Sequence, residues 1–226
     1  MVNILNNKVK TQEKKIVSLE KGNNELMAKV IKHKQYEDYL NKKIEKEKQF
    51  QIENSKIVET KEEIEFLNRL LPNKKFKLLY RATKDGDSYN EFHSKVNNKG
   101  ETITLFKTDK NRKFGGHISK SWNSSSGWQK GDVSYFLFNF NEKKCYKDKN
   151  NYLYNNGQFY CDVNTGPYFY GGGGNLCIGK GGSLLGRDIG YEYQRFTQLS
   201  NIKRDYEFSG ENRFTCVEIE VYQVIS

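Results

Sequence analysis

The first 48 residues repeat hydrophobic side chains with the seven-residue period of a coiled coil. With position a set at Val2, nine of the fourteen a and d positions are aliphatic, namely Val2, Leu5, Val9, Ile16, Leu19, Leu26, Val30, Leu40 and Ile44. Each aliphatic a residue is β-branched and each aliphatic d residue is leucine, the combination that packs best in a parallel two-stranded coil. The pattern predicts a long helix within a coiled-coil domain spanning 1–60.

Polar residues interrupt this seam and shape the expected pairing. Asn23 occupies an a position, where it would face its mate and fix the register at some cost in stability. His33, Glu37 and Glu47 weaken the C-terminal end of the seam, the two carboxylates by repulsion in a parallel dimer. We expect a homodimer, or a helix paired with another protein, through residues 1–48. The alternative is a single solvated helix.

The period of the hydrophobic residues changes after residue 60. A short amphipathic helix is predicted over 61–71 and ends at Pro72, because proline disfavours helical backbone in the residue before it. Beyond it, short alternating segments bounded by Gly, Asn, Asp or Ser predict strands. These segments are 76–81, 102–108, 114–122, 133–140, 143–147, 159–163, 176–178 and 214–224. Ser88 and Glu91 form a capping-box pattern that predicts a short helix over 89–96.

Many short strands at this spacing predict an antiparallel β-sandwich rather than a parallel sheet. The expected fold class is therefore α+β: a sandwich domain over 61–226, with short flanking helices, preceded by the long coiled-coil helix. In the last strand, Glu218 and Glu220 share one face. We interpret that face as solvated, in preference to a carboxylate pair for glycoside chemistry.

Composition adds limits on function. Hydrophobic residues make up 35% of the chain and charged residues 29%, which suits a solvated helix, whereas 14% aromatic residues require a packed core. The net charge of +10 is spread over both halves, so nucleic-acid binding is not expected. The sequence has neither an apolar run of membrane-spanning length nor a signal-peptide stretch at its start. We expect a cytoplasmic protein without membrane insertion, which a partner could hold on organelle membranes or the cytoskeleton.

Signatures of catalysis are weak. Residues 174–180 match the spacing of a phosphate-binding loop, but Gly181 replaces the Ser or Thr that would bind magnesium. The four cysteines, Cys145, Cys161, Cys177 and Cys216, contain no CxxC pair, so we interpret them as reduced thiols rather than zinc ligands or disulfides. Redox chemistry at one of them is the enzymatic alternative. We expect no enzyme activity, cofactor or metal.

Several segments, taken in order, resemble the TLDc domain. They are LLYRATKDGDSYNEFHSK (78–95), TITLFKT (102–108), KFGGHISKSW (113–122), DVSYFLFNF (132–140), YFYGGGGNLCIG (168–179) and FTCVEIEVYQV (214–224). The resemblance covers about residues 64–226 and includes the structural motif residues Arg81, Asp85, Gly86, Phe92, Gly115, Gly116, Gly171, Gly172, Gly173 and Gly174. Asn175 stands where relatives commonly carry an acidic residue.

The resemblance implies a β-sandwich without established catalytic machinery. It also implies a role in protection from oxidative stress and binding to the vacuolar proton-pumping ATPase (V-ATPase). We therefore expect a non-enzymatic adaptor or regulator of a large complex, with a structural component of a cytoskeletal or filamentous assembly as the alternative. The contact is expected on sandwich loops or on 171–182. Asp85, His93 and Lys180 are candidate contact residues.

Overall fold

The computed structural model of the chain describes residues 2–49, 52, 54–131, 134–149, 152–170, 175–178, 183–193, 199–200, 202 and 205–225. The chain divides into two compact units, Met1–Gln49 and Phe50–Ser226, which we describe separately. This division lies earlier in the chain than the expected boundary at residue 60. The reason is that Ile52, Ile57 and Val58 are buried in the core of the second unit.

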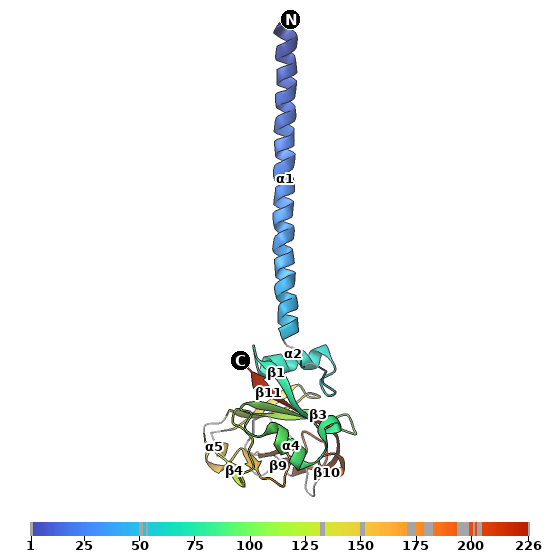
Figure 1. Ribbon diagram of the computed structural model, residues 1–226, viewed down its shortest axis with the longest axis vertical. Helices are drawn as coiled ribbons and strands as arrows, with labels where there is room; N and C mark the ends of the chain where they lie inside the picture. The colour runs from blue at the N-terminus through green and yellow to red at the C-terminus, as the bar shows by residue number, and fades with distance from the viewer. Residues whose placement is uncertain are drawn as a thin grey trace. The chain divides into compact units, whose positions relative to one another are not determined.

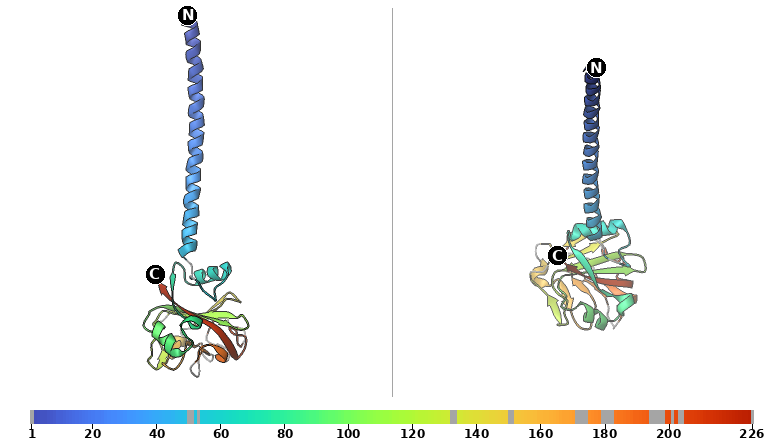
Figure 2. Two further views of the ribbon diagram at one scale, coloured as in Figure 1. Left: turned by 45° about the vertical axis from the view of Figure 1, so that its right-hand side comes forward. Right: turned by 45° about the horizontal axis from the view of Figure 1, so that its top comes forward.

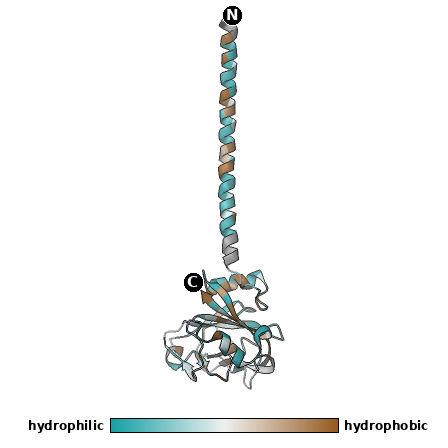
Figure 3. Cartoon of the chain, viewed as in Figure 1, coloured by the Kyte–Doolittle hydropathy of each residue, from teal (hydrophilic) through white to brown (hydrophobic). Residues whose placement is uncertain are grey.

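The first unit is a single helix, α1, which runs from Val2 to Gln49 without a break. The long helix predicted from the heptad pattern is thus present. Side chains are described for residues 5–43, and all of them are exposed. Figure 3 shows hydrophobic positions recurring at intervals along α1 between hydrophilic ones. Pairing of this helix with a partner stays a prediction.

The second unit is built on antiparallel strands (Figure 1). The described residues form eleven: β1 (Lys75–Arg81), β2 (Thr102–Thr108), β3 (Lys113–Ile118), β4 (Gly127–Gln129), β5 (Tyr135–Asn139), β6 (Lys144–Lys147), β7 (Phe159–Cys161), β8 (Tyr168–Tyr170), β9 (Asn175–Ile178), β10 (Gly186–Tyr193) and β11 (Arg213–Ile225). Their order is β4-β7-β8-β9-β10-β11-β2-β3-β5-β6. β11 pairs with β2 along one edge and with β10 and then β1 along the other.

The sheet folds over on itself and forms a sandwich, which two further views show from other sides (Figure 2). β2 and β8 are four strands apart in the sheet order, yet the rings of Phe106 and Phe169 lie 6.2 Å apart. A methyl group built on Gly116 of β3 would lie 2.5 Å from Phe169, so only glycine permits this close approach of the two layers. The interior between the layers holds the larger core, with Trp122 at its centre among Phe92, Phe159 and Phe169.

A second core lies on the outer face of the sheet. Helix α2 (Lys61–Leu70) packs Phe66 and Leu67 with Phe138, Tyr222 and Val224 of the strands. Thr60 caps the start of α2: its side chain accepts the N–H of Glu63, while the Glu63 carboxylate accepts the N–H of Thr60. This capping box supplies partners for backbone donors that the first helical turn leaves free. Residues 54–60 and α2 therefore cover sheet surface that would otherwise face water.

Three short helices complete the unit: α3 (Ala82–Asp85), α4 (Tyr89–Val96) and α5 (Tyr152–Asn156). Ser88 caps α4, as predicted, by accepting the N–H of Glu91. Phe92 of α4 is fully buried and packs edge-on against Tyr80 and Trp122, which fixes the helix to the inner core.

The expected fold class is confirmed: an antiparallel sandwich with short helices follows a long helix. Each of the eight predicted strands overlaps an observed one, although residue 133 of the expected segment 133–140 lies outside the described residues. β4, β8 and β10 were not predicted. The expected glycine motif 171–174 and Lys180 also lie outside the described residues.

Candidate functional site

A buried ion pair joins the first and last strands of the sandwich. Arg81 ends β1 and stands opposite Glu220 of β11 in the strand register. The Arg81 Nε donates to Glu220 Oε1 at 2.7 Å, and the Glu220 side chain is completely buried. Burial disfavours the charged form of Arg81, but the hydrogen bond and charge of Glu220 outweigh it and raise the pKa of Arg81. Arg81 therefore keeps its positive charge at neutral pH.

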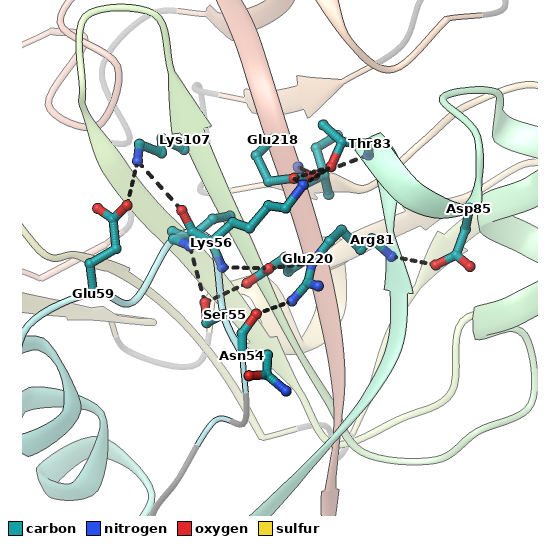
Figure 4. Close-up of polar contacts among 12 residues, drawn as sticks. Asn54, Ser55, Lys56, Glu59, Arg81, Thr83, Asp85, Lys107, Glu218 and Glu220 are labelled. Carbon is teal, nitrogen blue, oxygen red and sulfur yellow. Dashed lines mark hydrogen bonds and ion pairs between the residues drawn. The ribbon is translucent and has the colours of Figure 1, made fainter.

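The segment that precedes α2 is fastened to this pair (Figure 4). The Ser55 hydroxyl donates to Glu220 Oε2 at 2.5 Å, and the Lys56 N–H donates to Glu220 Oε1 at 2.9 Å. Tyr222 OH gives the carboxylate a further donor at 3.0 Å. Arg81 also donates to the carbonyl of Asn54. The buried pair of Arg81 and Glu220 thus holds together β1, β11 and residues 54–56.

Glu218 forms the second part of the cluster. Its carboxylate accepts the hydroxyl of Thr83 and, at 3.2 Å, the N–H of the same residue. The Lys56 Nζ lies 3.9 Å from Glu218 and donates to the Thr83 hydroxyl at 2.9 Å. Glu218 therefore ties α3 and residue 56 to β11.

The prediction of a solvated face for Glu218 and Glu220 was wrong. Both carboxylates are buried, and they act as acceptors for residues of β1, α3 and the segment 54–56. Buried carboxylates are tolerated when they are paired and hydrogen-bonded, and here both conditions hold. This arrangement fastens the leading segment to the sandwich.

A second ion network holds the start of α2. Lys113 of β3 donates to Glu59 at 2.7 Å and to Glu63 at 2.9 Å, and Lys107 of β2 donates to Glu59 at 3.0 Å. Burial disfavours the charge of Lys113, but the two carboxylates outweigh it and raise its pKa. The hydrogen bond from Lys113, helped by Lys107, lowers the pKa of Glu59. Lys113 and Glu59 therefore stay ionised at neutral pH.

The structure places two of the three candidate contact residues in structural roles. The Asp85 carboxylate accepts the N–H of Arg81 at 2.9 Å and lies 3.4 Å from the Lys95 ammonium. His93 is buried, with Nε2 near the carbonyls of Asp162 and Thr165 at 2.8 and 3.0 Å. These contacts tie His93 to the loop after β7. The two residues have separate partners, and Lys180 is outside the described residues.

The remaining described motif residues shape the backbone. Gly86 has a φ of +106°, a conformation that residues with a Cβ rarely adopt, and its carbonyl accepts the Tyr80 hydroxyl at 2.8 Å. A methyl group built on Gly115 would meet the carbonyl of Thr104 and the ring of Phe138. Gly115 and Gly116 thus permit close contact on the two faces of β3.

Ser55, Lys56, Glu59 and Lys113 were not singled out from the sequence. A signal for part of this arrangement was present in the capping box of Thr60 and Glu63, which sets the start of α2 and leaves the preceding residues free to lie along the sheet. The contact between this segment and β11 joins residues 165 positions apart, and local patterns carry no information about it.

An aromatic cluster occupies the outer surface of β4, β7 and β8. Trp128 is 37% exposed, and its ring lies 5.1 Å from Tyr160, 5.4 Å from Tyr168 and 5.0 Å from Tyr170. The three tyrosines are partly buried. We call these four residues the Trp128 cluster. Tryptophan and tyrosine supply large contact areas with few rotatable bonds, and both are enriched in protein interfaces.

Three of the four thiols lie in environments that suppress their reactivity. Burial raises the pKa of Cys161 to about 11 and raises the pKa values of Cys145 and Cys216 as well. All four cysteines are free thiols. Within the part of the chain that the structure describes, no group of three or more His, Cys, Asp or Glu side chains is placed to hold a metal ion. No described helix is both long and apolar enough to span a membrane.

Fold and motifs together define a β-sandwich module that is preceded by an extended helix. The sequence model of the TLDc domain family matches residues 52–225. The chain therefore belongs to the TLDc-domain family, and the resemblance stated above is confirmed. The match begins shortly before the segment 54–56 and shortly after the first unit ends, which agrees with the division between the two units. A search of curated proteins finds no match.

Proposed function

We propose that this protein is a non-enzymatic adaptor or regulator whose TLDc domain binds a large protein complex in a stress-protective role, with the V-ATPase as the leading candidate. Membership of the TLDc family is the observation that carries the proposal. We place the protein in the cytoplasm, where its partner holds it at organelle membranes. The elevated pKa values of Cys145, Cys161 and Cys216 favour protection through a partner over redox chemistry at these thiols.

The Trp128 cluster supports a protein contact on the sandwich. Its central residue is partly exposed and surrounded by tyrosines, which is the composition of an interface hot spot. It also ends at Tyr170, directly before the segment 171–182 on which the contact was expected. We assign the partner contact to this surface in place of Asp85 and His93, because those side chains are engaged inside the domain.

The test is a binding measurement between the purified full-length chain and purified V-ATPase. The wild-type chain should bind ATPase subunits directly. Trp128→Ala should weaken binding by about 30-fold or more, the effect of losing a hot-spot residue. Tyr152→Ala is the matched control, since Tyr152 is 38% exposed and lies outside the cluster, and it should bind like the wild type.

Three outcomes distinguish the proposed partner, the proposed contact surface and the alternative role. Absence of binding by the wild-type chain would contradict the proposed partner. Binding that Trp128→Ala leaves unchanged would keep the partner and remove the Trp128 cluster from the contact. Recovery of filament proteins in place of ATPase subunits, in a parallel capture from cell extract, would favour the alternative role as a structural component.

A further inference from the structure

Helix α1 carries a row of aliphatic side chains, interrupted at Gln12 and Asn23, that its own unit leaves uncovered. Among the seam residues with described side chains, Leu5, Val9, Ile16, Leu19, Leu26 and Val30 are each at least half exposed. Exposed aliphatic surface of this extent marks an interaction site, since its burial is favourable by about 25 cal/mol per Å². The row follows the a and d positions and is therefore a narrow seam of the kind that a second helix covers.

We propose that the seam is covered by a second copy of this chain, aligned parallel and in register, and that the pairing is confined to residues 2–30. This inference concerns self-association and does not rest on the proposed function.

The seam is complementary to itself. The seam has β-branched residues at a positions and leucine at d positions, a combination that favours a parallel dimer of helices over a trimer or tetramer. The a residues are Val9, Ile16 and Val30, and the d residues are Leu5, Leu19 and Leu26. Asn23 strengthens this assignment, because in a parallel pair it meets Asn23 of the other copy and the two amides can hydrogen-bond. In an antiparallel pair an a residue faces a d residue of the other helix, so Asn23 would not meet Asn23 of the other copy.

Charges beside the seam select the parallel orientation. In a parallel coil each g residue lies near the e residue of the next heptad on the other helix, which places Lys8 against Glu13 and Lys15 against Glu20. Each of these attractions occurs twice in a symmetric dimer. An antiparallel arrangement brings g positions together, and four of them are lysines: Lys8, Lys15, Lys29 and Lys43. Repulsion among these lysines disfavours that orientation.

The same rules end the pairing after Val30. In a parallel dimer, Lys29 at g would face Lys34 at e, an unfavourable contact. The next seam residues, His33 and Glu37, are polar and lie 3.5 Å apart as an intrahelical pair within one chain. Residues beyond 30 therefore add little to dimerisation. The expected assembly is a dimer with two TLDc domains and one coiled coil formed by residues 2–30 of both copies.

Sedimentation equilibrium of the full-length chain tests the oligomeric state. The expected mass at micromolar concentration is twice the 26.5 kDa of one chain. Leu19→Lys places a charge in the seam and should return the mass to that of a monomer. Val17→Lys is the matched control: Val17 is 65% exposed on the same turn of α1 but lies outside the seam, and this variant should stay dimeric. A monomeric wild-type chain, or equal effects of the two variants, would overturn the proposal.

Two further variants test the orientation. Leu5→Cys should form a disulfide-linked dimer under mild oxidation, because residue 5 meets its own copy only when the helices are parallel and in register. The combined change Glu13→Lys and Glu20→Lys should weaken dimerisation at low salt, and adding Lys8→Glu and Lys15→Glu should restore it. A dimeric Leu5→Cys chain that does not crosslink, or a charge reversal without restoration, would refute the parallel register.

Discussion

Replacing Arg81 with methionine tests whether the buried ion pair holds the domain together. Methionine keeps an unbranched apolar side chain of similar length but removes the charge that faces Glu220. Glu220 is completely buried, and breaking such a pair from one side typically costs about 3–5 kcal/mol. Ser55, the Lys56 N–H and Tyr222 still donate to the carboxylate, so we expect the lower end of that range, about 3 kcal/mol.

Urea unfolding followed by tryptophan fluorescence measures this loss, because Trp122 is buried in the inner core. A loss of about 3 kcal/mol lowers the unfolding midpoint by about 1–3 M for m values of about 1–3 kcal/mol per M. Lys110→Met is the control. Lys110 pairs with Glu211 at 2.6 Å but is 61% exposed, and such surface pairs contribute less than about 1 kcal/mol.

Arg81→Lys separates charge from shape. It keeps a cation near Glu220 and should lose less stability than Arg81→Met, although lysine cannot reproduce the two directed contacts to Glu220 and to the Asn54 carbonyl. An Arg81→Met chain as stable as Lys110→Met would refute the reasoning. Equal losses for the lysine and methionine variants would show that packing, and not charge, gives Arg81 its effect.

Three further predictions concern the interior of the domain. Gly116→Ala should lower the free energy of unfolding by about 1–3 kcal/mol, measured by urea denaturation, because its methyl group would lie 2.5 Å from Phe169. Burial raises the pKa of Glu192 from 4.5 to about 7, so the folded state holds more protons than the unfolded state between these values. The free energy of unfolding should therefore fall by about 3 kcal/mol as pH rises through that window. Unfolding of the wild type and of Glu192→Gln near pH 5 and near pH 8 measures this fall, which the variant should abolish. Cys161, with a pKa of about 11, should react with iodoacetamide near pH 8 about 100-fold more slowly in the native chain than after denaturation, as mass spectrometry of the labelled peptide would report.

Features set by short-range patterns could be predicted from the sequence. The heptads of α1, the N-cap of α4 at Ser88, and the alternation in β2 and β11 each depend on neighbouring residues, and the structure has helices and strands there. β4 and β8 were not predicted, and each has only three residues, too few to show an alternation by themselves. β7 is as short, but the predicted segment 159–163 continued two residues beyond it. β10 was not predicted because its sequence, GRDIGYEY, mixes glycines with charged residues. Its strand conformation depends on pairing with β9 and β11.

The burial of Glu218 and Glu220 could not be predicted from β11 alone. Alternating charged residues in a strand usually face water, since glutamate is seldom buried without a partner. Here the partners come from Arg81 of β1, from Thr83 of α3, and from Ser55 and Lys56 in the segment that precedes α2. Recognising the buried pair required knowing that the first and last strands are neighbours, which is a property of the tertiary fold.

The central place of β11 has a consequence for how the chain folds as it is synthesised. β11 follows the other described strands in sequence, yet it pairs with β1, β2 and β10 and supplies the carboxylates that fasten residues 54–56. The sandwich therefore cannot complete its folding on the ribosome until β11 has been synthesised and has emerged. Until then the edges of the earlier strands that pair with β11 stay unpaired. The α1 helix needs only local contacts and can form long before that point. Truncation within β11 should consequently yield a chain with a folded helix and an aggregating remainder.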